Sequence, residues 1–111
     1  MTDDRLVLYS EDDRVARITL NMPERRNSLT QAGIDALSQA WSRFEAGPAR
    51  VAILSGSGGS FCAGLDLETA PDPAPAVPGI GAEVTKPVIA AVCGPAVGLG
   101  LTLTVQADLA I

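Results

Sequence analysis

Residues 51–67, VAILSGSGGSFCAGLDL, decide the fold, because a short apolar run passes there into a glycine-rich turn. The run at 50–54 (RVAIL) lacks polar alternation and is too short for a helix, which predicts a strand buried on both faces, as in a parallel sheet. Residues 88–104, VIAAVCGPAVGLGLTLT, repeat the pattern: we expect a strand within 86–92, a turn at Gly94-Pro95 and a helix over 98–106. The apolar residues 108–111 (DLAI) begin a further buried strand.

The residues before this stretch predict a β-hairpin followed by a helix. Apolar runs flank an acidic turn at 11–13, so we expect Val7, Arg17 and Thr19 on one face of the hairpin and Leu6, Leu8, Val15, Ile18 and Leu20 on the other. The second strand ends at 21–23 because proline donates no ladder hydrogen bond. From the predicted N-cap Thr30 to the stop at Gly47-Pro48, helical spacing relates the apolar residues Ile34, Leu37, Trp41 and Phe44.

The resulting order of elements is typical of an α/β domain. With 111 residues the chain fits one domain, in which the Pro/Ala-rich stretch 69–85 is expected to be an exposed loop, partly in the polyproline II conformation. Because Ile111 closes the chain inside an apolar strand, we interpret residues 1–111 as a single truncated domain, incomplete at the C-terminus. An uncovered apolar strand predicts marginal stability and self-association.

Composition excludes several classes of function. The net charge of −5 argues against nucleic acid or an anionic membrane as a partner. There is no histidine, so neither a histidine-dependent nucleophile nor a histidine zinc site can form within the chain. Cys62 and Cys93 lie in apolar context and are expected to be buried, reduced thiols. The acidic N-terminus carries no apolar signal region and no stretch reaches the roughly 20 residues of a membrane span, so we expect a cytoplasmic protein.

The two glycine turns are the candidate site. Glycine lets a backbone approach a ligand closely, and the first N–H groups of a helix have no intrahelical acceptor. If both turns converge, their N–H groups would hold a carbonyl oxygen that gains negative charge during a reaction. The alternative is that they are ordinary tight turns of an α/β domain. Nucleotide fingerprints fail, because Phe61 and Leu103 stand where GxGxxG needs a third small residue and GxxxxGK[ST] is absent.

Three blocks together resemble the crotonase, or enoyl-CoA hydratase/isomerase, superfamily: RVARITLNMPERRNSLT (14–30), VAILSGSGGSFCAGLDL (51–67) and KPVIAAVCGPAVGLGLTLTVQADLAI (86–111). The resemblance implies a crotonase-like spiral of β-β-α units and an acyl-CoA substrate of fatty acid metabolism. It implies lyase or isomerase chemistry with no cofactor beyond the coenzyme A of the substrate. Relatives assemble into homo-trimers or hexamers through C-terminal helices that these residues do not include.

The same resemblance assigns site residues. It makes the backbone N–H groups of Leu65 and Leu99 an oxyanion hole that stabilises the thioester enolate. It places substrate contacts at Arg25, Ala63, Leu65, Asp66, Leu67, Gly98, Leu99 and Thr102. Arg25 and Arg26 would meet the CoA phosphates, or else form a solvated basic pair. Asp66 would act in the site, or else cap a helix that follows it.

One departure concerns the chemistry: Thr102 stands where resembling hydratases place a catalytic glutamate. A hydroxyl cannot serve as a general base at neutral pH because its pKa is far too high. The second carboxylate of the family would fall downstream of Ile111, and Cys93 replaces a frequent asparagine. Whether the 111 residues catalyse a reaction is therefore open, and enoyl-CoA hydration is expected near background. The alternatives are a non-catalytic or degenerate crotonase fragment, or an isomerase or hydrolase that relies on residues downstream of Ile111.

Overall fold

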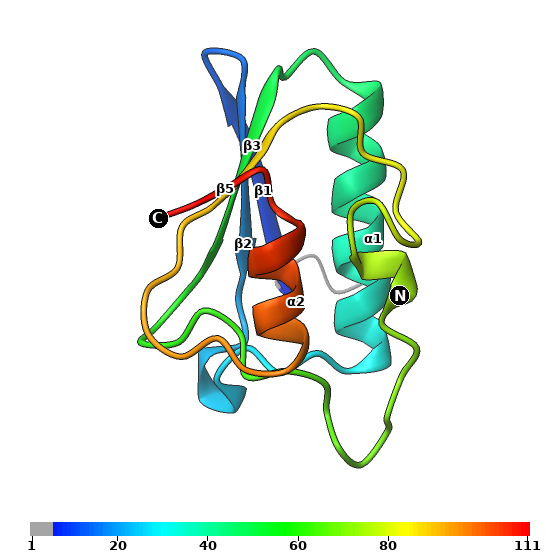
Figure 1. Ribbon diagram of the computed structural model, residues 1–111, viewed down its shortest axis with the longest axis vertical. Coiled ribbons are helices and arrows are strands. Elements are labelled where there is room, and N and C mark those ends of the chain that lie inside the picture. Colours follow the sequence, from blue (N-terminus) through cyan, green and yellow to red (C-terminus); the bar gives the residue numbers. More distant parts are fainter. Residues whose placement is uncertain (1–5) are drawn as a thin grey trace.

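Five strands form one sheet in the order β1-β2-β3-β4-β5 (Figure 1). A computed structural model describes residues 6–111, apart from the side chains of Leu101 and Val105; the acidic start at 1–5, discussed above for its lack of a signal region, lies outside the described residues. The strands are β1 (Val7–Asp12), β2 (Val15–Leu20), β3 (Val51–Gly56), β4 (Val88–Ala90) and β5 (Leu109–Ala110). The first pair is antiparallel and the other three pairs are parallel. The predicted α/β order of elements is confirmed.

The hairpin is confirmed, but its faces are the reverse of those expected for β1. Val7 pairs with Leu20 and is buried in the core, whereas Leu8 pairs with Thr19 and is 43% exposed. The turn consists of Asp13 and Arg14, both with positive φ as in a type I′ turn, so the two acidic residues before it belong to β1. Alternation along β2 buries Ala16 and leaves Val15 only half-buried. Because both residues are apolar, the sequence pattern does not distinguish the buried face of the hairpin from the exposed one.

Helix α1 (Gln31–Ala46) follows the sequence prediction closely. The Thr30 hydroxyl accepts a hydrogen bond from Gly33 N at 3.2 Å, and Gly47 is the C-cap. The four apolar residues of the predicted stripe are all buried. The helix runs alongside the sheet (Figure 1), and Lys86 Nζ ties down its C-terminal end by donating to three carbonyls within 44–49, at 2.6–2.9 Å.

The proline-rich connection does not match the predicted exposed loop. It forms a short 3-10 helix, Ala74–Ala76, and the residues from Ala76 to Pro78 are buried. The reason is Trp41, whose indole N–H donates to Ala76 O at 2.8 Å and whose ring packs inside the core. The segment therefore closes one side of the core against α1.

The described residues correct three further expectations of burial. In β3 only Ala52 and Leu54 are buried, while the residues between and beside them are half-buried, so the strand is covered fully on one face. Cys62 is buried but Cys93 is exposed, and both are free thiols. At the other end of the sheet, the expectation of a buried strand over 108–111 is wrong, because Leu109 is 62% and Ile111 80% exposed. Within residues 6–111 no helix has the length and apolar character needed to cross a membrane.

Candidate functional site

The two glycine-rich loops lie against each other. Cys62 and Ala96 form a parallel bridge, and Val97 N donates to Cys62 O at 3.0 Å. Gly64 has a φ of +108°, and a Cβ added to it would lie 3.1 Å from Val97 O and 3.7 Å from Leu99 N. The loops that follow β3 and β4, far apart in sequence, are thus in direct backbone contact.

Glycine allows the second helix to pack directly against the first loop. Helix α2 (Leu99–Gln106) begins after Gly98, whose φ is +56°. A Cβ added to Gly100 would collide with Cys62 O, so only glycine lets the first turn of α2 approach this backbone. The predicted helix over 98–106 is confirmed with its first residue as the N-cap.

At this junction the backbone N–H groups of Leu65 and Leu99 have no acceptor within the described residues. On either side of Leu65, Leu29 N donates to Gly64 O at 2.8 Å and Asp66 N donates to Leu29 O at 2.9 Å. Leu99 is the first residue of α2, where helix N–H groups lack intrahelical partners. Both groups are therefore available to an external acceptor.

A cleft of about 730 Å³ opens between the loops, and its wall is mainly apolar. It brings together six of the eight predicted contact residues: Ala63, Leu65, Asp66, Leu67, Gly98 and Leu99. Arg25 and Thr102 do not line it. Sequence reasoning missed four others, Ser28, Gly64, Glu68 and Val97. The sequence could have indicated Glu68 as a lining residue, because it lies in the polar turn directly after the glycine loop.

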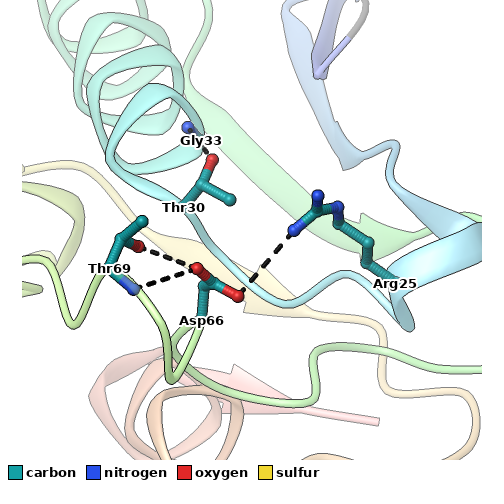
Figure 2. A network of polar contacts seen from close by, with 5 residues as sticks. All are labelled: Arg25, Thr30, Gly33, Asp66 and Thr69. Atoms are coloured by element: carbon teal, nitrogen blue, oxygen red, sulfur yellow. Dashed lines mark hydrogen bonds and ion pairs between the residues drawn. The ribbon is translucent and has the colours of Figure 1, made fainter.

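Asp66 and Arg25 meet at the rim of the cleft (Figure 2). Arg25 Nη1 lies 3.8 Å from Asp66 Oδ1, with the arginine side chain about half exposed. Asp66 Oδ2 accepts from Thr69 N at 3.2 Å and from the Thr69 hydroxyl at 2.9 Å, as Figure 2 shows. Asp66 caps a turn over 67–69, so the expectation that it caps a helix is wrong, because no helix begins between Asp66 and Ala74.

The position of Thr102 offers no carboxylate. Its half-buried hydroxyl donates to Gly98 O, one turn earlier in the chain, at 3.4 Å. The nearby Cys62 thiol is no substitute, since burial raises its pKa above the ordinary value of 9.0 and keeps it protonated. Among the described residues, no group of three Cys, Asp or Glu side chains is arranged to hold a metal ion.

Sequence reasoning also missed the buried residue that supports the first loop, Asn27. Its side-chain oxygen accepts from Met22 N at 2.7 Å, and its amide donates to Ser57 O and Ser60 O, each at 2.9 Å. The side chain is fully buried, and its backbone is left-handed with a φ of +57°. Asn27 thereby joins the segment after β2 to the loop after β3, which leads into the cleft.

Solved structures define the class of fold. The chain superposes on enoyl-CoA hydratase EchA1 from Mycobacterium marinum with a TM-score of 0.85 and 36% identity, covering 96% of this chain and 45% of that one. It superposes on an enoyl-CoA hydratase/isomerase from Mycobacterium paratuberculosis with a TM-score of 0.87 and 25% identity, covering 99% and 48%. The fold is therefore that of the crotonases.

Sequence comparison then gives the family. The model of the enoyl-CoA hydratase/isomerase family matches residues 10–76, and the chain belongs to this family. It is 38% identical to (E)-benzylidenesuccinyl-CoA hydratase of Thauera aromatica, covering 95% of this chain and 46% of that protein. It is 36% identical to the probable enoyl-CoA hydratase echA6 of Mycobacterium tuberculosis, covering 96% and 46%. The chain spans about half the length of the curated relatives it matches.

Proposed function

We propose that this chain binds acyl-CoA thioesters and polarises the thioester carbonyl with the N–H groups of Leu65 and Leu99. The observation that carries the proposal is that both donors line one cleft and neither has an acceptor among the described residues. A carbonyl oxygen placed in the cleft would give both donors a hydrogen-bond partner. The names of the relatives, which are CoA hydratases, support a CoA thioester as the source of the carbonyl.

The same two donors suit an enolate better than a ground-state carbonyl. When a proton leaves the carbon beside a thioester, negative charge collects on the carbonyl oxygen, and fixed donors then bind it more strongly. The mainly apolar wall would strengthen this effect once a bound substrate displaces water from the cleft, because charges interact more strongly in a low dielectric. Enolate stabilisation, the step that lyases and isomerases of this kind would share, is thus the proposed contribution of this half of the fold.

The remaining contacts follow from the shape of the cleft. Ala63, Leu67 and Gly98 would border the acyl and pantetheine groups, while Asp66 would hold the rim through its turn. Arg25 is beside the rim, where a half-exposed guanidinium suits a CoA phosphate. Thr102 lies behind Gly98 and would act only as a neighbour of the donor at Leu99.

Isothermal titration calorimetry with acetyl-CoA and with free CoA, under identical conditions, tests the proposal. The thioester is expected to bind more tightly, because only it carries a carbonyl for the paired donors. Equal affinities for the two ligands, or no binding of either, would overturn it.

A further inference from the structure

We infer that Asn27 is a positioning residue, which holds the first glycine loop so that the Leu65 N–H points into the cleft. This inference rests on the proposed function and names the side chain on which one of its donors depends. It starts from a juxtaposition in the fold: the segments that carry Asn27 and Leu65 run side by side, with a parallel bridge between Leu29 and Leu65. Asn27 does not line the cleft itself, so its effect passes through the backbone.

The direction of the Leu65 N–H is set by its pairing with Leu29. Leu29 N donates to Gly64 O at 2.8 Å, and Asp66 N donates to Leu29 O at 2.9 Å. In a parallel ladder, a residue whose two neighbours bond to the partner segment has its own N–H and C=O on the opposite side. The Leu65 N–H therefore points away from Leu29, and a slip of one residue in this pairing would turn it away from the cleft.

Asn27 fixes this pairing through its side chain. Its amide donates to Ser57 O and to Ser60 O, each at 2.9 Å, while its side-chain oxygen accepts from Met22 N at 2.7 Å. The side chain is fully buried, so water does not compete for these hydrogen bonds. Asn27 thus locks the two bridged segments together a few residues before the Leu65 donor.

The backbone around Asn27 is shaped for this contact. Its φ of +57° is left-handed, a conformation that asparagine adopts more readily than most residues. The adjacent Arg26 O accepts from Ala63 N at 2.9 Å, which extends the pairing along the loop. A Cβ added to Gly56 would lie 2.6 Å from Ser60 O and 2.8 Å from Asn27 Nδ2, so only glycine leaves room for this hydrogen bond.

Asn27→Gly tests the inference, by isothermal titration calorimetry with acetyl-CoA and with free CoA. Glycine accepts the left-handed backbone but makes none of the three side-chain hydrogen bonds. The preference of the protein for acetyl-CoA over CoA should shrink about two- to twelve-fold, the contribution of one neutral hydrogen bond. A loss of folded protein cannot produce this result, because the folded fraction cancels in the ratio of the two dissociation constants.

Lys86→Met is the matched control. It also loses three side-chain hydrogen bonds, but Lys86 does not line the cleft. Its preference for acetyl-CoA should therefore equal that of wild type. Asn27→Asp is the second test variant: it keeps the left-handed backbone and an acceptor for Met22 N, but its carboxylate cannot donate to the loop. It should lose the preference as Asn27→Gly does.

Proton–nitrogen correlation NMR observes the donor directly. In wild type, saturation with acetyl-CoA should move the Leu65 and Leu99 amide protons downfield relative to saturation with CoA, because both gain a carbonyl acceptor. In Asn27→Gly the Leu65 shift should be lost. The Leu99 shift should persist, since this donor belongs to α2 and not to the loop that Asn27 holds.

These measurements separate the inference from the proposed function. If wild type prefers acetyl-CoA and a folded Asn27 variant keeps both that preference and the Leu65 shift, Asn27 does not position the donor, while the proposed function survives. If neither Asn27 variant folds, the side chain is a requirement of the fold and the positioning role is overturned. If wild type binds acetyl-CoA no better than CoA, the proposed function fails and this inference fails with it.

Discussion

Replacing Leu99 by proline removes one proposed oxyanion donor and leaves the helix that carries it intact. Leu99 is the first residue of α2, and its N–H bonds to no described group. Proline is well tolerated at this helix position, because the N–H it lacks is unpaired in any case and its fixed φ suits the first turn. Because the donor is a backbone N–H group, proline is the only substitution that removes it; every other residue keeps this N–H.

The expected loss differs between binding and reaction. One neutral hydrogen bond to the ground-state carbonyl contributes about 0.5–1.5 kcal/mol, which corresponds to roughly a two- to twelve-fold weaker affinity for acetyl-CoA. Removal of a donor to a developing oxyanion typically lowers the rate of enolate formation about 10²- to 10³-fold. Exchange of the acetyl protons of acetyl-CoA in heavy water, followed by proton NMR, should fall by that factor. Free CoA has no acyl carbonyl, so its affinity should not change.

Leu99→Ala is the matched control, because it loses the same buried side chain but keeps the N–H. Leu99 is only 7% exposed, and truncation to alanine costs about 2–5 kcal/mol of stability, so both variants will be less stable than wild type. The readout is accordingly the ratio of the CoA and acetyl-CoA dissociation constants, in which the folded fraction cancels. A Leu99→Pro ratio equal to that of Leu99→Ala would refute the reasoning.

Three further predictions concern hydrogen bonds that stabilise the fold, and urea denaturation tests each of them. Asn27→Ala removes the three hydrogen bonds of a fully buried side chain and should cost about 2–4 kcal/mol, with a loss near zero counting against the role of this side chain. Lys86→Met keeps the apolar stem but loses three bonds to the carboxyl end of α1, so about 2 kcal/mol or more should be lost, whereas unchanged stability would show that water replaces the ammonium. Hydrogen bonds from Thr85 lower the pKa of Glu45 below its ordinary 4.5. The resulting stabilisation of the fold is fully present above pH 4.5 and is lost as the pH falls through the lowered pKa. Thr85→Val should make unfolding less dependent on pH in this acid range, and an unaltered pH dependence would contradict the assignment.

Patterns within a few residues determined the elements of secondary structure. The helical spacing of the buried stripe, the hydroxyl of Thr30 and the glycine at position 47 predicted α1, and all three act through neighbours in the chain. The glycine turns after β3 and β4 were visible for the same reason. The backbone N–H groups of Leu65 and Leu99 were named from the resemblance to a family, because the residues alone left ordinary tight turns as an alternative.

Only the tertiary structure decided where these elements meet. Burial of Val7 rather than Leu8 depends on pairing across the hairpin, and burial of the proline-rich segment depends on Trp41 from α1. Contact between Gly64 and the start of α2 depends on the parallel pairing of β3 with β4, whose residues are distant in sequence. Local propensities carry no information about such pairings, since a turn or a cap is stabilised by atoms a few residues away. The cleft, and the place of Glu68 on its wall, thus arise from long-range packing.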